Sequence, residues 1–215
     1  MVGRTGAGKS SSLRLLGGLY APWSGSVRIA GEAPSSLSEE DRRRLIGGVP
    51  QVVQLFSGTV FDNLILGDES VSREAVQRAA TVAGSDSFIQ NLPNGYDTML
   101  GRGVDLSGGQ RQLLALARAL VWDPAVLLLD EATAAIVSAS EAAFRAALRA
   151  SVSSQDRAVL TVAHRLSTSR EADQVLVMEE GTPEDLMRRQ GRFTALLELE
   201  AAGWDWRVDG RTLSQ

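Results

Sequence analysis

Short apolar runs alternate with stretches of helical periodicity along most of the chain. Three of these runs, at residues 125–129, 158–163 and 174–178, have the length and composition of strands that are buried on both faces. Apolar spacing and capping residues predict helices at residues 11–19, 38–45, 139–150, 183–190 and 193–202. Strands that alternate with helices in this way indicate an α/β fold around a parallel sheet.

A longer helical region interrupts this alternation. Apolar residues recur at helical spacing between residues 61 and 92, where Gly84 is predicted to end a helix. Residues 113–120 predict a strongly apolar helix, which Asp123 and Pro124 end. We expect the region from residue 61 to residue 106 to be a helical insertion in the α/β core. Shorter strands are predicted at residues 26–30 and 45–53, and a polar, mobile tail at residues 204–215.

Composition excludes several classes of protein. The 215 residues are ordinary for one soluble globular domain, with 44% hydrophobic and 22% charged residues. No apolar run approaches the roughly 20 residues of a membrane span, and no signal peptide is visible. The net charge of −4 gives no electrostatic case for nucleic acid binding, and the absence of cysteine excludes a thiolate site. Lys9 is the only lysine and His164 the only histidine.

The most informative stretch is residues 3–10, Gly-Arg-Thr-Gly-Ala-Gly-Lys-Ser, hereafter the phosphate loop. It fits the pattern G-x-x-x-x-G-K-[ST] at every fixed position. Glycines allow the tight backbone curl in which amides point at phosphate oxygens. The lysine is expected to reach the β- and γ-phosphates, and the serine hydroxyl to reach Mg²⁺. The helix that follows would present its N-terminus to the anion.

Two acids end the apolar run at residues 125–129. A phosphate-loop ATPase needs a carboxylate at this place to hold Mg²⁺ through water, and Asp130 fits that role. Glu131 is one residue further on, where it could polarise an attacking water. An acidic turn after a strand is common, but its occurrence after a phosphate loop favours the functional interpretation.

A second anion site is predicted at residues 106–110, Leu-Ser-Gly-Gly-Gln, hereafter the signature motif. Ser107 is placed to cap the helix that follows, and the two glycines leave its first amides accessible. Alone, the motif would be an ordinary helix cap. Together with the phosphate loop it suggests that two chains share each nucleotide.

The chain resembles the nucleotide-binding domain of an ABC transporter, because five motifs occur in that family's order between residues 3 and about 186. The resemblance implies that Glu131 is the catalytic base, that His164 contacts the γ-phosphate, and that Gln51 touches Mg²⁺ and senses the transporter. It implies a metal site formed by Ser10, Gln51 and Asp130, with Lys9 also assisting catalysis. The implied nucleotide-binding residues are Gly3, Arg4, Thr5, Gly6, Ala7, Gly8, Lys9, Ser10, Ser11, Ser107, Gly108, Gly109 and Gln110.

The resemblance also implies an architecture and partners. Residues 55–60, 92–98 and 110–112 are more similar to exporters than to importers. The implied fold is a P-loop NTPase (RecA-like) parallel sheet flanked by helices, with residues 1–58 and 107–203 as core, residues 59–106 as a helical subdomain and residues 204–215 as tail. The implied ligands are ATP and Mg²⁺. The implied partners are a second ATPase domain, identical or different, arranged head to tail, and the transmembrane domain of an exporter on the cytoplasmic side of the membrane.

Four departures from the family pattern leave alternatives open, one of which is that residues 178–183 lack the short strand that usually precedes the Gly-Thr segment. The N-terminal antiparallel strands, with the aromatic residue that stacks on adenine, are largely missing from the sequence. Val137 stands where the family usually has an aspartate, and residues 101–103 lack the usual exporter glutamate. A nucleotide-binding fragment with little turnover is therefore one alternative. A soluble, non-transport ABC ATPase is another, although the chain shows neither a second cassette nor a long coiled coil.

Overall fold

The computed structural model describes residues 1–3, 6–101, 104–130, 138–153, 157–162, 172–178, 183–191, 194 and 198. The predicted tail at 204–215, and most of the predicted helix at 193–202, lie outside these residues. The α-helices are α1 (Lys9–Leu16), α2 (Glu39–Leu45), α3 (Val60–Ile65), α4 (Arg73–Val82), α5 (Asp86–Gln90), α6 (Gly108–Leu120), α7 (Ser138–Ser153) and α9 (Pro183–Arg188). The strands are β1 (Val2–Gly3), β2 (Ile46–Val49), β3 (Gly58–Thr59), β4 (Met99–Leu100), β5 (Val126–Asp130), β6 (Ala158–Val162) and β7 (Val177–Met178), and 3₁₀ turns occupy Pro34–Ser36 and Gly95–Asp97.

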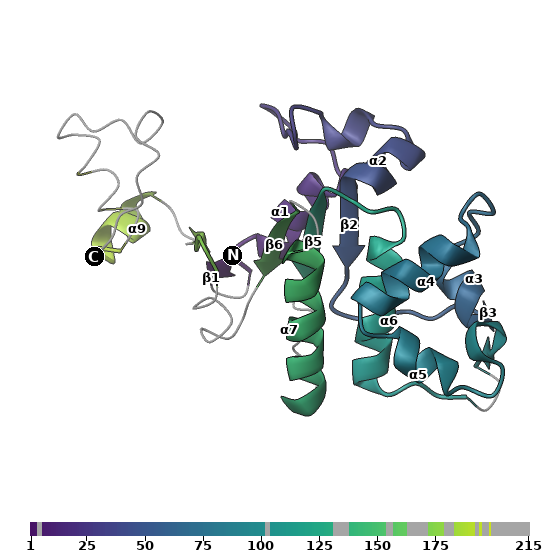
Figure 1. Cartoon of the computed structure of the whole chain (residues 1–215). Coiled ribbons are helices and arrows are strands. Elements are labelled where there is room, and N and C mark those ends of the chain that lie inside the picture. The colour runs from purple at the N-terminus through teal and green to yellow at the C-terminus, as the bar shows by residue number, and fades with distance from the viewer. Residues whose placement is uncertain are drawn as a thin grey trace.

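A parallel sheet lies at the centre of the fold, as the sequence predicted. Its strand order is β2-β5-β6, and Val49 lies opposite Leu129 in the register. Figure 1 shows α1 beside β5 and β6, the helices α3 to α6 on the other side of β2, and α7 below the sheet. The α/β class of the prediction is confirmed.

Alternate residues of β5 enter two different hydrophobic clusters. Leu128 packs with Leu13 of α1 and Val162 of β6. Its neighbours Leu127 and Leu129 point to the opposite face and join the larger cluster built mainly from the helices. Successive side chains of a strand alternate between faces, so this central strand is buried on both sides. The sequence-based prediction for residues 125–129 is confirmed.

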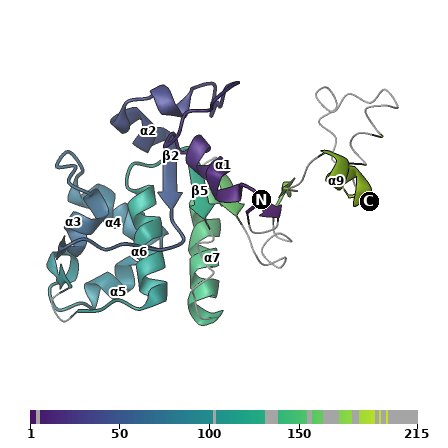
Figure 2. The same cartoon turned by 180° about the vertical axis from the view of Figure 1, so that it is seen from behind.

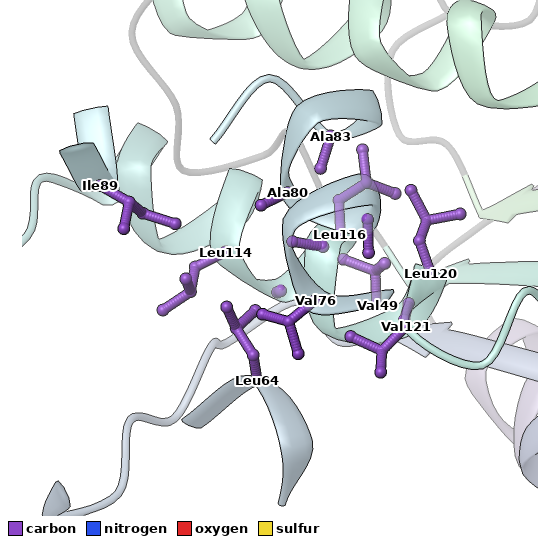
Figure 3. Close-up of a cluster of buried hydrophobic side chains, with 14 of the residues drawn as sticks. Val49, Leu64, Val76, Ala80, Ala83, Ile89, Leu114, Leu116, Leu120 and Val121 are labelled. Atoms are coloured by element: carbon purple, nitrogen blue, oxygen red, sulfur yellow. The ribbon is translucent and has the colours of Figure 1, made fainter. Parts of the chain in front are cut away.

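The larger cluster joins the helical region to the sheet. Leu114 and Leu116 of α6, both fully buried, lie near Val76 of α4 and Val49 of β2, as Figure 3 shows. The predicted helical stretch between residues 61 and 92 consists of three helices, and Gly84 with φ 69° follows α4 as expected. The division of the chain into a core and a helical subdomain at residues 59–106 stays a prediction.

The prediction of a buried strand at residues 174–178 was wrong. Strand β7 contains only two residues, and it pairs in parallel with β1, Gly3 opposite Met178. Val175, Leu176 and Val177 are 46%, 54% and 50% exposed. In the described part of the chain, β1 is the only strand hydrogen-bonded to β7.

The strand predicted at residues 26–30 was also wrong. The structure has a single antiparallel bridge there, between Ile29 and Glu32, with Ala30 and Gly31 at positive φ. Alternation of apolar and polar residues is necessary for a half-buried strand, but a ladder also needs a partner strand. The longer strand predicted at residues 45–53 is confirmed over Ile46–Val49.

Buried Arg157, at the start of β6, forms hydrogen bonds with the segment that precedes β5. Its side chain is 3% exposed, it donates to Pro124 O at 2.6 Å and Ser151 O at 2.9 Å, and it pairs with Asp123. Loss of hydrogen bonds to a charged group costs about 1.5–3 kcal/mol each, and the buried carbonyl oxygens would lose their donor.

We therefore expect Arg157→Met to lower the free energy of unfolding by at least about 3 kcal/mol, because two such bonds are lost. Urea denaturation measures it. Arg44→Met is the matched control, because Arg44 and its partner Glu40 are both exposed at the surface. Such a pair contributes about 0–1 kcal/mol. Equal losses in the two variants would contradict a structural role for Arg157.

None of the helices in the described residues combines the length and the apolar composition needed to cross a bilayer.

Candidate functional site

The phosphate loop begins at β1 and ends at α1. Gly6 and Gly8 have φ of 89° and 88°, in the left-handed region that glycine adopts at little cost. Gly3 is constrained by a close approach instead, because a Cβ there would lie 2.4 Å from Met178 O. Gly6 and Gly8 are therefore explained by their own backbone conformation, and Gly3 by the close approach of β7. Figure 2 shows α1 and the chain before it beside the central sheet.

Lys9, the first residue of α1, is 5% exposed. Its ammonium Nζ donates to Gly3 O across the loop at 2.9 Å. A buried ammonium needs acceptors around it, and phosphate oxygens are stronger acceptors than a peptide carbonyl. The side chain thus lies along the loop that it was predicted to serve.

Ser10 and Asp130 come together although the sequence separates them by 120 residues. The Ser10 hydroxyl donates to Asp130 Oδ1 at 3.2 Å. Asp130 is the last residue of β5, at the edge of the sheet where the phosphate loop also lies. A hydroxyl beside a carboxylate forms an oxygen site of the kind that Mg²⁺ accepts, with phosphate and water completing its shell.

Gln51 lies at the same edge of the sheet. It follows β2 by two residues, and the register pairs Val49 with Leu129, the residue before Asp130. The carboxyl ends of parallel strands form the usual ligand edge of an open α/β sheet. The Gln51 side chain is exposed, and its backbone oxygen accepts a hydrogen bond from Gln112 Nε2 at 3.2 Å.

The signature motif caps α6. Ser107 Oγ accepts from Gln110 N at 3.2 Å, and the Gln110 side chain accepts in return from Ser107 N at 2.9 Å. This capping box satisfies two amides that the helix leaves without internal partners. Ser107 and Gly108 are exposed, whereas Gly109 is buried against the helix group. The motif therefore faces solvent with the first turn of a 13-residue helix behind it.

Several predicted site residues lie outside the described part of the chain. These are Arg4 and Thr5 of the phosphate loop, Glu131, His164 and the departure at Val137. Ala7 and Ser11 lie within the loop and on α1, and Ser11 is exposed. The last described residue of β6, Val162, lies opposite Asp130 in the sheet, and His164 comes two residues later in the chain. The roles of Arg4, Thr5, Glu131 and His164 therefore stay predictions.

A cavity of about 250 Å³, which the sequence did not predict, lies beside the signature motif. Val53, Leu55 and Phe56 line it from the segment after Gln51. Leu100 of β4, Gly101 and residues 104–106 line it from the other side, and Arg111 of α6 adds a positive charge to this lining. No single motif marks such a cavity, because its two walls are about 45 residues apart in the sequence.

Comparison with known proteins agrees with this geometry. The family model described as ABC transporter matches residues 1–134. P-glycoprotein 14 of Caenorhabditis elegans is 42% identical over 207 residues, which cover 93% of this chain and 15% of that protein. A probable multidrug resistance ABC transporter ATP-binding/permease protein of Bacillus subtilis, YheH, is 41% identical over 93% of this chain and 30% of its own length.

A solved structure extends the comparison to three dimensions. The structure of a bacterial Atm1-family ABC exporter with ATP bound is 40% identical in sequence, with a TM-score of 0.72. The match covers 93% of this chain and 36% of that chain. The chain thus spans between about a seventh and about a third of the length of these similar proteins.

Proposed function

The chain belongs to the ABC transporter family, and from this premise we propose that it binds and hydrolyses ATP to power an exporter. The observation that carries the proposal is the hydrogen bond from Ser10 to Asp130 at 3.2 Å, beside the buried ammonium of Lys9. This contact supports the proposal, because it brings together two residues that the sequence predicts in one magnesium site. The ATP-bound exporter that this chain resembles supports the choice of nucleotide.

Each residue has a defined task in this proposal. Lys9 holds the β- and γ-phosphates, while Ser10, Gln51 and Asp130 hold Mg²⁺. Mg²⁺ supplies positive charge that neutralises the phosphate oxygens. Glu131 orients the attacking water and accepts its proton, and His164 stabilises charge at the γ-phosphate. Catalysis is then mainly positioning and electrostatic stabilisation.

The second anion site serves a neighbouring domain. Ser107 and Gly108 are exposed at the start of α6, and Figure 1 shows α1 and α6 on either side of β2. We place the signature motif of one chain against the phosphate loop of a second ATPase domain, related by a two-fold axis. Two nucleotides would then lie between two domains, each held by both.

The cavity beside the signature motif is proposed to receive a segment of the exporter's membrane part. Six apolar residues line it, Val53, Leu55, Phe56, Leu100, Val104 and Leu106, together with polar groups of Ser57, Asp105 and Arg111. The Bacillus subtilis relative combines, by its name, an ATP-binding part with a permease. In this proposal the domain works on the cytoplasmic side of a membrane, attached through that partner.

A substitution in the signature motif tests the shared site. We expect Ser107→Arg to lower turnover at least about tenfold, because the guanidinium would fill the partner's phosphate site. Nucleotide binding to the isolated chain should stay within about twofold, since the phosphate loop is untouched. Steady-state hydrolysis and calorimetric titration of ATP measure the two quantities.

Ser107→Ala is the matched control, because both substitutions remove the hydroxyl that caps α6. The loss of the cap costs about 1 kcal/mol in either variant. A difference in turnover between the two therefore reports the obstruction of the partner's site. Equal turnover in the alanine and arginine variants would contradict the shared site.

A further inference from the structure

Gln112 is a polar residue in an otherwise apolar face of α6. It is 4% exposed, and on the same side of the helix lie Ala115 and Leu116, which are 2% and 0% exposed. Its Nε2 donates to Gln51 O at 3.2 Å. Among the described residues, no donor lies within hydrogen-bond reach of its Oε1. Among the described residues the side chain therefore makes one hydrogen bond, and its acceptor is the backbone of Gln51, a predicted metal-site residue.

A second side chain of α6 holds the same segment further along. Arg118 donates to Gln54 O at 3.2 Å and to Asn63 O at 2.8 Å, and its guanidinium lies 5.7 Å from the centre of the Phe56 ring. Burial lowers the pKa of this guanidinium, which stays charged because its ordinary pKa is far above neutrality. The Arg118 guanidinium has lost part of its hydration, so the carbonyl oxygens of Gln54 and Asn63 stabilise its charge in place of water.

Asn63, 1% exposed, completes the attachment. Its Oδ1 accepts from Phe56 N at 2.8 Å and its Nδ2 donates to Phe56 O at 2.9 Å. The segment from residue 51 to residue 56 is therefore held at three points, and α6 provides two of them. The same segment forms one wall of the cavity beside the signature motif.

We propose that Gln112 is a positioning residue for ATP turnover, which holds Gln51 in a set place relative to the signature motif on the same helix. The inference rests on the proposed function, because it assigns Gln51 and Ser107 to nucleotide sites. A helix is stiff over its length, so Ser107 at its start and the Gln51 carbonyl on its side move together. Any displacement of the cavity wall is then passed to both sites.

Packing alone does not account for a glutamine at this position. An unpaired buried acceptor is unfavourable, and methionine fills a similar volume without a polar atom. The variant Gln112→Met therefore removes the hydrogen bond to Gln51 and the unpaired oxygen at the same time. We expect its melting temperature to stay close to that of the parent chain, which separates positioning from folding.

The first readout is hydrogen exchange by mass spectrometry on the full chain without nucleotide. In Gln112→Met we expect the protected amides among residues 51–56, such as the Phe56 amide that is hydrogen-bonded to Asn63, to exchange at least about tenfold faster, because one of the three attachments of this segment is lost. Gln77→Met is the matched control, since Gln77 is exposed on α4 and outside the proposed machinery. Its exchange in residues 51–56 should equal that of the parent.

The second readout separates binding from turnover. Gln112→Met should lower kcat about tenfold or more, since misplacement of a catalytic group by about 1 Å can cost 10²-fold. The dissociation constant for ATP should change less than about twofold, because the phosphate loop keeps its contacts. Gln112→Leu provides a second variant in case the methionine variant is unstable.

The outcomes are distinguishable. Unchanged exchange at residues 51–56 in folded Gln112→Met, or an unchanged kcat, would overturn the positioning role. A kcat and a dissociation constant that worsen equally would also overturn it, because they would indicate general damage to the site. A parent chain that binds no ATP would instead refute the proposed function, and the exchange result would still decide whether Gln112 holds residues 51–56.

Discussion

Lys9→Ala is expected to weaken ATP binding about 10²-fold, which corresponds to about 3 kcal/mol. The ammonium of Lys9 is buried, and its position beside the phosphate loop makes it the main positive charge of that loop among the described residues. Hydrogen bonds to charged groups contribute about 1.5–3 kcal/mol each, and the proposal gives this residue two phosphates. Titration calorimetry with ATP measures the loss.

Lys9→Arg is the control that separates the effect of the positive charge from the effect of the shape of the side chain. It keeps the positive charge, but a planar guanidinium replaces a compact ammonium in a buried position. Binding should therefore fall between that of the parent and the alanine variant. Because Lys9 also donates to Gly3 O, thermal denaturation must show that each variant is folded at the temperature of the titration. Parent-like ATP affinity in folded Lys9→Ala would refute the role of Lys9.

The phosphate loop could be predicted from the sequence because its physics is local. Gly6 and Gly8 adopt the left-handed conformations that the motif requires, and the lysine and serine follow directly on α1. The contact between Ser10 and Asp130 is not local, yet the strand before Asp130 was apolar enough to be placed in the sheet. Motif order and strand burial together predicted which residues would meet.

Other features depended on what the rest of the chain places nearby. The apolar residues 175–177 favour a buried strand, but nothing in their own pattern says which element covers them. The alternation at residues 26–30 also favours a strand, although a strand requires a partner of matching register. Gln112 was missed because the signal, a glutamine in an apolar helix face, becomes meaningful only when the carbonyl of Gln51 is seen beside it.

Glu131→Gln is expected to lower hydrolysis at least about 10²-fold while ATP binding is retained. The amide keeps the size of the carboxylate but cannot accept the proton of the attacking water.

Asp130→Asn is the contrasting variant, because Asp130 accepts a hydrogen bond from Ser10 and lies where Mg²⁺ would bind. That change should raise the Mg²⁺ concentration for half-maximal turnover about 10–100-fold. In the residual activity of Glu131→Gln, the Mg²⁺ concentration for half-maximal turnover should equal that of the parent.

A mixture of two inactive variants provides the sharpest test of Glu131 in a shared site. In a mixed dimer, the Ser107→Arg chain supplies an intact phosphate loop and an intact Glu131 to one of the two sites. The Glu131→Gln chain supplies the intact signature motif to that same site. An equal mixture should recover about a quarter of parental turnover, because about half of the dimers are mixed and each has one intact site. Neither variant alone should recover when its concentration is raised. If the mixture stayed as inactive as its components while cross-linking showed mixed dimers, Glu131 and Ser107 would not belong to one composite site.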